Sequence, residues 1–349
     1  MSYITPVEKR KGLHLFGSPN ELFLIAAIVV LSLIIGFTNP VFFSIATPFD
    51  LLRSSLIEIL FGLGLLIVLI SGGIDISFPI VGIFAGYTTV VIMLNFGLDT
   101  YSLWIPIVLA AIIGAILGSI NALLIAGFGL PTLIATLGTT GMFRGFLLSY
   151  IGSVYIANIP LGLDQFSTAD LLAIQLEGGT LARLHVLVIP VLLLALAIAW
   201  MLRRTMFGRT VFAIGGSEES ARRMGMNVRW TKARIYMLVG ALSGIAGILY
   251  ISLQRKADPY DLAGTELTII AAVVLGGASI MGGYGTVTGT ILGVLLINLI
   301  RDNLILLGIP GSWQRAAVGL MLLIGVMSQA ISDKRRSKQV VTVAGEDNS

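Results

Sequence analysis

Asp75 is the carboxylate whose position most favours a functional role, because it lies inside a long apolar stretch. It belongs to the segment Ser71-Gly72-Gly73-Ile74-Asp75-Ile76-Ser77, and Pro79 follows. A carboxylate at membrane depth is costly, and such residues commonly mark a transport pathway. The same side chain could instead cap a helix, since the positive end of the helix dipole stabilises an acid. The sequence leaves both roles open and predicts a pathway or gate at Ser71, Gly72, Gly73, Asp75 and Ser77.

A second glycine-rich interruption lies near the other end of the chain, at Gly276-Gly277-Ala278-Ser279 and Gly282-Gly283-Tyr284-Gly285. Irregular backbone at membrane depth is tolerated only where protein or a water-filled cavity surrounds it, and paired interruptions indicate a translocation path. We therefore add three residues to the predicted pathway: Gly276, Gly277 and Ser279. We expect this pathway to be mildly polar and to lack a tight solute pocket.

Other polar residues fall within apolar stretches. Arg144 needs a partner or a water-lined cavity at that depth. The uncharged ones could join helices by hydrogen bonds or line a path for a neutral solute, and the sequence does not separate these roles. They are Asn121, Asn298, Gln314, Thr136, Thr139 and Thr140.

Motifs for catalysis and metal binding are missing from the sequence. The chain has no cysteine, and its two histidines, His14 and His185, are far apart, so we expect no metal site. It contains no GxxxxGK[ST], HExxH or GxSxG pattern. We therefore predict no catalytic residue and no cofactor in this chain. The net charge of +4 is not a nucleic-acid signal, because the basic residues cluster as membrane orientation requires.

The segment 203–234 is a basic loop between two apolar runs, with seven arginines and one lysine against two glutamates. Within it, Ser217 can cap a short helix that has acids in its first turn. We expect Ala221 and Met224 to insert into a groove of a soluble partner, with Arg222 and Arg223 meeting acids around it. The predicted coupling residues are Gly215, Gly216, Ser217, Glu218, Glu219, Ala221, Arg222, Arg223, Met224 and Gly225. A plain loop that only sets orientation is the alternative.

The elements that must position these residues are membrane helices. The 349 residues are 56% hydrophobic and 11% charged, whereas about a quarter of a soluble domain is charged. Apolar runs near the bilayer-spanning length recur along the chain and predict an all-α, polytopic fold with about ten transmembrane helices and broken glycine-rich segments. The runs are roughly 22–37, 52–71, 76–94, 103–126, 131–151, 185–202, 233–253, 266–281, 287–307 and 314–332.

The charge distribution predicts one threading of these spans. Fifteen of the 22 basic residues lie in three clusters, Lys9–Lys11, 203–234 and Lys334–Lys338. Basic residues favour the cytoplasm, so both termini and the basic loop 203–234, the coupling loop, are placed there. The loop 152–184 carries Asp164, Asp170 and Glu177 against Arg183 and is placed outside. The domains are then a cytoplasmic segment 1–21, a transmembrane domain 22–332 and a cytoplasmic tail 333–349.

Four ordered motifs resemble the permease subunits of bacterial ABC importers for monosaccharides, the ribose-permease-like carbohydrate uptake transporter-2 family. LISGGIDIS at 69–77 resembles the family's SGGIDLSVG signature, although Phe78-Pro79 replaces the usual Val-Gly. LPTLIATLGTTGMFRG at 130–145 is similar to its proline–threonine–leucine–glycine segment. The cytoplasmic loop at 207–228 and the glycine-rich segment at 271–293 resemble the remaining two. Together the matches cover most of residues 50–330.

The resemblance implies a ten-helix permease in a bacterial inner membrane, surrounded by lipid. It implies two permeases, identical or sister chains, that form one pathway for a monosaccharide. An ABC ATPase, which binds ATP and Mg²⁺, would dock below, and a periplasmic sugar-binding protein would deliver the solute.

Related importers leave the solute open. Permeases for autoinducer-2, nucleosides or branched-chain amino acids are similar enough to compete with a sugar permease. A secondary transporter driven by an ion gradient is the alternative from another class. It should show intramembrane carboxylates that bind protons or sodium, and Asp75 is the strong candidate.

The predicted threading can be tested by labelling, because the native chain has no cysteine. Ser220→Cys and Thr168→Cys each introduce one thiol. An impermeant thiol reagent added outside intact cells should label residue 168 and should label residue 220 only after permeabilisation. Labelling of residue 220 alone from outside would invert the threading.

Overall fold

The computed structural model describes residues 19–98, 102–175, 181–304, 308–310, 313–314, 316–317, 319–320, 323 and 327. Residues 1–18 of the predicted segment 1–21, the predicted tail 333–349 and most of the tenth predicted span lie outside these residues, and the last three residues of the predicted segment 1–21 belong to α1. The described elements are α1 (Pro19–Thr38), η1 (Pro40–Phe43), α2 (Ala46–Ile70), α3 (Phe78–Asn95), α4 (Trp104–Ala122), η2 (Leu123–Gly127), α5 (Thr132–Phe146), η3 (Leu147–Ile151), α6 (Leu161–Ser167), β1 (Asp170–Gln175), β2 (Leu181–His185), α7 (Val188–Arg204), α8 (Met206–Gly216), α9 (Glu218–Arg223), α10 (Val228–Gln254), α11 (Glu266–Leu275) and α12 (Val287–Asn303).

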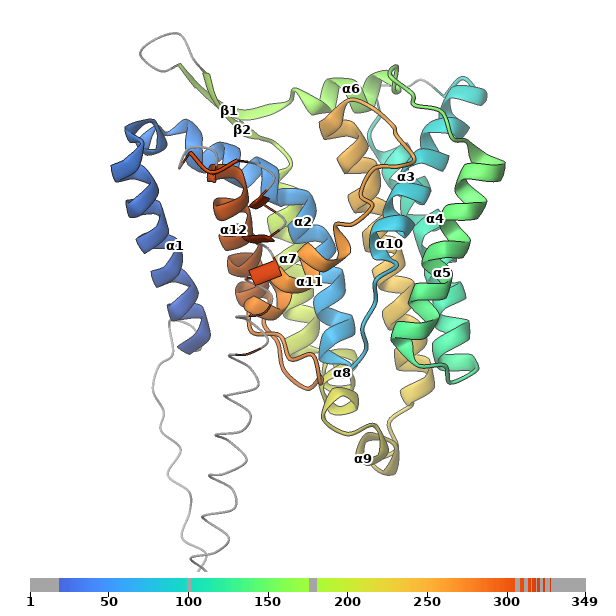
Figure 1. Ribbon diagram of the computed structural model, residues 1–349. Helices are drawn as coiled ribbons and strands as arrows, with labels where there is room; N and C mark the ends of the chain where they lie inside the picture. Colours follow the sequence, from blue (N-terminus) through green and yellow to red (C-terminus); the bar gives the residue numbers. More distant parts are fainter. Residues whose placement is uncertain are drawn as a thin grey trace, which may run out of the picture.

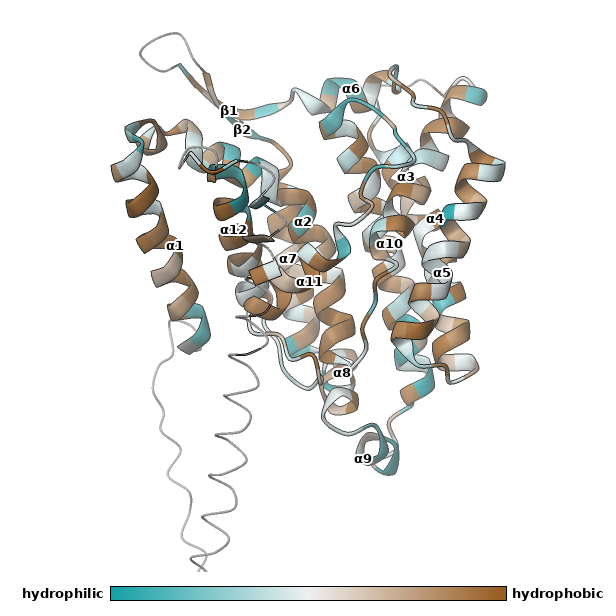
Figure 2. Ribbon diagram, in the orientation of Figure 1, coloured by the Kyte–Doolittle hydropathy of each residue, from teal (hydrophilic) through white to brown (hydrophobic). Residues whose placement is uncertain are grey.

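The fold is a bundle of apolar helices, as expected for a polytopic membrane protein (Figures 1 and 2). Among the described residues, five helical segments are long and apolar enough to cross a membrane: α1, α2, α3, α4 with η2, and α10. The pair α7–α8, bent by 71°, makes a sixth if it is one span. Three other predicted spans coincide with the shorter helices α5, α11 and α12, of 15, 10 and 17 residues.

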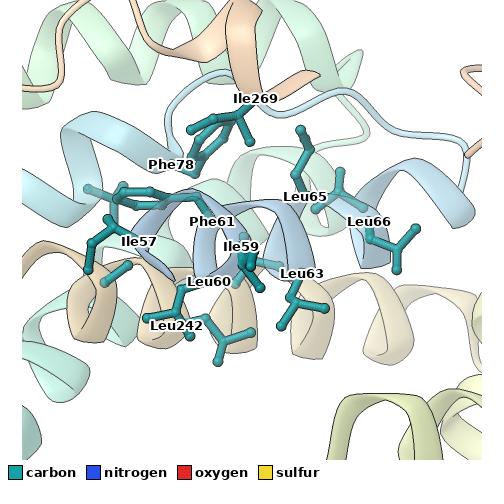
Figure 3. Close-up of a cluster of buried hydrophobic side chains, with 14 of the residues drawn as sticks. Ile57, Ile59, Leu60, Phe61, Leu63, Leu65, Leu66, Phe78, Leu242 and Ile269 are labelled. Carbon is teal, nitrogen blue, oxygen red and sulfur yellow. The ribbon is translucent and has the colours of Figure 1, made fainter. Parts of the chain in front are cut away.

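The core surrounds the second half of α2, which is apolar on all sides because other helices cover it from Ile59 to Ile70. Phe61, Leu63 and Leu65 are at most 2% exposed, and Figure 3 shows them among side chains that include Leu242 of α10 and Ile269 of α11. The rings of Phe61 and Phe78 lie 5.4 Å apart, centroid to centroid. This burial holds α2 in a fixed position between both ends of the bundle.

Glycine pairs let neighbouring helices approach closely. Gly114 of α4 faces Gly240 of α10, where an added Cβ on either residue would overlap the other's carbonyl oxygen. Gly289 and Gly293 of α12 meet α11 in the same way, against the carbonyl oxygens of Gly276 and Ala272. The GxxxG pairs Gly114/Gly118 and Gly289/Gly293 therefore serve helix packing, as small residues do in membrane proteins.

The two ends of the bundle differ. The short helix α6 and the hairpin β1–β2 lie at one end, and α8 and α9 lie at the other (Figure 1). The hairpin pairs its strands antiparallel and corrects the expectation of an all-α chain. Its residues fall in the predicted outer loop, where the backbone is not confined to helices as it is inside a bilayer. The acidic loop and the basic loop thus lie at opposite ends.

Candidate coupling and gating site

Three glycine-containing segments, distant in sequence, meet where α2 ends. The amide nitrogen of Gly283 donates a hydrogen bond of 2.8 Å to the carbonyl oxygen of Ile70, the last residue of α2. A Cβ added to Gly215, at the end of α8, would overlap that same oxygen and the Gly283 nitrogen. Gly72 turns the chain away from α2 with a φ of 81°, which glycine adopts without strain. The broken span, the coupling loop and the second glycine-rich segment are therefore in direct backbone contact.

A polar cavity of about 290 Å³ opens beside this contact. Ser71, Gly72 and Gly73 form one wall of the cavity. The coupling loop contributes Gly215, Gly216, Ser217, Glu218 and Lys232 to the lining. Other parts of the chain contribute Thr132, Tyr236 and Met281. Residues predicted for the gate and residues predicted for coupling thus share one cavity.

Asp75 lies deeper, in the extended segment between α2 and α3, and is 3% exposed. Its Oδ1 accepts hydrogen bonds from the backbone nitrogen and the hydroxyl of Ser77, both at 2.7 Å. The Asn121 side chain donates to the Ser77 oxygen at 2.8 Å. Asp75 therefore organises the turn before α3, whereas the N-cap position of the helix itself is Ser77 and has no side-chain cap hydrogen bond. Control of a gate by Asp75 stays a prediction.

Threonines of α5 satisfy the rest of the broken segment. Thr132 accepts a hydrogen bond from the Ile74 nitrogen at 3.1 Å. The Thr136 hydroxyl accepts from the Ile76 nitrogen at 3.4 Å and lies 3.3 Å from the Ile74 carbonyl oxygen. Backbone groups at membrane depth need such partners. From the sequence, Thr136 has two open roles, helix contact and pathway lining, and Thr132 is not among the predicted residues, although their spacing of four places both on one helix face.

Helix α3 begins at Phe78 with Pro79 in its first turn. Proline is tolerated there because the first helical nitrogens have no partner within the helix. The Phe-Pro pair that departs from the family pattern therefore fits the helix start without disturbing it.

The second predicted pathway segment serves mainly to pack helices. Gly276 and Gly277 are buried, and Gly276 faces α12. The Ser279 nitrogen donates to the Tyr284 carbonyl oxygen at 3.0 Å, closing a turn. Met281 lines the cavity instead, and Gly282 and Gly283 contact the coupling loop.

The coupling helix is formed as predicted. Ser217 caps α9, its oxygen accepting from the Ser220 nitrogen at 3.2 Å. Glu218 accepts a hydrogen bond from Lys232 of α10 at 2.6 Å and pairs with Arg222 at 3.1 Å. The hydrogen bond from Lys232, the largest influence, holds the pKa of Glu218 below its ordinary value. Because Lys232 belongs to α10, this pair attaches the exposed helix to a membrane span.

One expectation for the coupling helix is wrong. Ala221 was expected to insert into a partner's groove, but its side chain is fully buried against Ile214 and Val228 of the same chain. Met224, at 65% exposure, remains free to contact another protein. Arg222 and Arg223 are exposed and pair within α9, Arg222 with Glu218 and Arg223 with Glu219. A protein that docks on α9 would therefore contact Met224 and the two arginine–glutamate ion pairs of this helix.

Comparisons with known proteins agree with this arrangement. A family profile described as "Branched-chain amino acid transport system / permease component" matches residues 47–326. The chain belongs to this permease family. It is a multi-pass protein of the bacterial inner membrane and a transport subunit rather than an enzyme. The predicted membership in the ABC-importer permeases is confirmed.

Curated relatives cover most of the permease. The autoinducer 2 import system permease protein LsrC of Salmonella typhi is 35% identical over 299 residues, which are 85% of this chain and 82% of the relative. The LsrC protein of Enterobacter sp. (strain 638) is 34% identical over 324 residues, 91% of this chain and 90% of the relative. The protein of the same name from Escherichia coli (strain K12 / DH10B) is 32% identical over 305 residues, 87% and 84%. No solved structure matches the chain.

The glycine contact at the end of α2 predicts unequal effects of two neighbouring substitutions. Gly215→Ala places a methyl group against the Ile70 carbonyl and should reduce both thermal stability and uptake, since overpacking costs about 1–3 kcal/mol. Gly216→Ala is the matched control, because nothing lies within 4 Å of its added Cβ. Melting of the purified permease and uptake by cells measure the effect. Equal behaviour of the two variants would contradict the proposed contact.

The hydrogen bonds of Asp75 predict a transport defect without a folding defect. Asp75→Asn keeps the shape but weakens the bonds from Ser77, because charge-assisted hydrogen bonds are the stronger kind. Uptake should slow while the membrane level of the permease and the solute affinity of the binding protein stay unchanged. Asp170→Asn, which changes a partly exposed ion pair with Arg183, is the control. Normal uptake by Asp75→Asn would exclude a role in the gate.

Proposed function

We propose that this chain is the permease subunit of an ATP-driven importer for a monosaccharide or a sugar-like solute. Two permeases, identical or sister chains, form the pathway, and each has ten spans with both termini in the cytoplasm. A separate ATPase holds ATP and Mg²⁺ and docks on the 203–234 loop. A periplasmic binding protein delivers the solute and supplies most of the selectivity.

The contact between the coupling loop and the end of α2 carries this proposal. A force applied to α9 reaches Gly215 through the short segment that joins α9 to α8, and Gly215 touches the Ile70 carbonyl. The Glu218–Lys232 pair gives a second connection, to α10. An exposed helix attached in this way to a broken membrane span is suited to couple a soluble motor to a gate.

Autoinducer-2 is a second candidate solute, because the relatives quoted above are named as permeases of autoinducer 2 import systems. Branched-chain amino acids are a further alternative, because the description of the family profile names them. The ion-coupled alternative is weaker, since Ser77 already engages the Asp75 carboxylate within the chain.

Reconstitution tests the function directly. The permease, the ATPase and the binding protein encoded with it would be placed in liposomes and supplied with radiolabelled solutes of the three classes. Uptake should require ATP, the ATPase and the binding protein together. Uptake driven by a proton or sodium gradient without the ATPase would reject the importer assignment.

Docking on α9 predicts that Met224→Asp prevents co-purification of the ATPase. An exposed methionine offers apolar contact, and a charge buried there without a partner weakens binding. The variant should insert normally, because Met224 lies outside the core. Met206→Asp changes another exposed methionine of the same loop, outside α9, and serves as the control. Retention of the ATPase by Met224→Asp would move the docking surface elsewhere.

A further inference from the structure

A surface groove lies between the end of α4 with η2 and the first turns of α10, toward the end of the bundle that carries α9 (Figure 1). Its volume is about 410 Å³. Four small residues of the two segments line it: Ala122, Ala126, Gly127 and Ala233. Deeper in the bundle the same helices touch, because a Cβ added to Gly118 would overlap the backbone of α10. The groove therefore begins where this close contact ends, and small side chains keep it open.

The lining of the groove is largely apolar. Leu123 and Met237 contribute its larger aliphatic side chains, which are 56% and 41% exposed. The Ser119 hydroxyl donates to the Ile116 carbonyl oxygen at 2.6 Å, so its hydrogen is already used within α4. Among the described residues, no acidic side chain lines the groove. An open apolar groove between membrane helices suits a hydrocarbon chain of the bilayer, because lipid tails are as apolar as leucine.

Two arginines lie at the outer limit of this groove. Arg229 lines it, and its Nη2 lies 4.0 Å from where a Cβ on Gly127 would be. The Arg234 Cζ lies 5.6 Å from the centroid of the Trp230 ring, and Trp230 also lines the groove. Both arginines are exposed, and neither forms an ion pair within the part of the chain that the structure describes. Their positive charge is therefore available to an anion.

The order of these groups along α10 matches the order of groups in a phospholipid. Helix α10 begins at Val228 and is long and apolar enough to cross a membrane, so Arg229 and Trp230 belong to its first turn. Tryptophan favours the boundary between headgroups and hydrocarbon, and Trp230 is 60% exposed. Met237 lies eight residue steps after Arg229, about 12 Å further along the helix. Positive charge, aromatic ring and apolar groove thus follow one another from the helix end inward.

We propose that this groove binds an anionic phospholipid. The phosphate contacts Arg229 and Arg234, the Trp230 ring lies at the level of the ester groups, and one acyl chain occupies the groove toward Met237. Basic pockets between membrane helices on the cytoplasmic side bind anionic headgroups, and the threading proposed above places this end in the cytoplasm. The site goes beyond the proposed function, because it depends on neither the solute nor the ATPase.

The lipid site and the coupling helix share the first turns of α10. Lys232, which lies between the two arginines in sequence, binds Glu218 at 2.6 Å. An anionic lipid at Arg229 and Arg234 therefore holds the same turns of α10 to which α9 is attached.

The test titrates the purified full chain, without the ATPase or the binding protein, and counts bound lipids by native mass spectrometry. Palmitoyl-oleoyl phosphatidylglycerol is the anionic lipid, and phosphatidylethanolamine with the same acyl chains is the zwitterionic one. Glycerol 1-phosphate supplies the anionic group without acyl chains. The first phosphatidylglycerol should bind at least about fivefold more tightly than phosphatidylethanolamine, and glycerol 1-phosphate should not displace it.

Variants locate the site. Arg229→Gln and Arg234→Gln should each weaken phosphatidylglycerol binding about fivefold, the effect of one basic residue near an anionic headgroup, and should leave phosphatidylethanolamine binding unchanged. Ala233→Phe fills the groove and should weaken phosphatidylglycerol binding although both arginines remain. Arg203→Gln is the matched control, because it removes an exposed arginine at the end of α7, outside the groove. Equal melting temperatures would show that the variants are folded.

Four results would each overturn the proposal. Equal affinity for the two lipids would leave only ordinary contact with the bilayer. An equal loss in Arg203→Gln would assign the preference to net charge rather than to this groove. Displacement of phosphatidylglycerol by glycerol 1-phosphate would leave an anion site without an acyl chain. Normal phosphatidylglycerol binding by Arg229→Gln, together with loss of the co-purified ATPase, would make this face a protein contact.

Discussion

The structure depends on one constraint, which is that backbone groups within a membrane must find partners inside the protein. Helix α2 ends at Ile70, and the next seven residues continue as a turn and an extended segment before α3 begins. Side chains of α5 bind the amides of this segment, Asp75 and Ser77 organise its end, and Gly283 binds the last carbonyl of α2. Helices distant in sequence are thereby held around one break.

The same constraint explains why glycines gather at the break. The carbonyl of Ile70 is approached by the backbone of two other segments, and any side chain at Gly215 would separate them. Glycine allows the coupling loop, the broken span and the late glycine-rich segment to pack backbone to backbone. Such contacts allow little relative movement, because protein interiors are close-packed and transmit strain. The glycine contacts therefore join the segment that carries the exposed helix α9 to the break between α2 and α3.

The sequence predicted features that depend on neighbouring residues. Apolar runs located the helices, Ser217 with two following glutamates located α9, and glycine doublets located the breaks. It did not predict pairings between distant residues. Thr132 is 58 residues from Ile74, and Arg301 is 243 residues from Glu58. Ala221 was misassigned for the same reason, since the residues of its own chain that bury it are revealed only by the folded loop.

Helix α2 also borders a second cavity, of about 480 Å³, to which Asp50, Arg53 and Glu58 contribute. Its last residue, Ile70, lies beside the polar cavity of about 290 Å³ at the coupling loop. The twelve residue steps from Glu58 to Ile70 correspond to about 18 Å of helix. Because α2 is buried along most of this length, it can shift only together with the helices packed around it. Helix α2 is therefore a rigid connection between the glycine contact at Ile70 and the cavity at its other end.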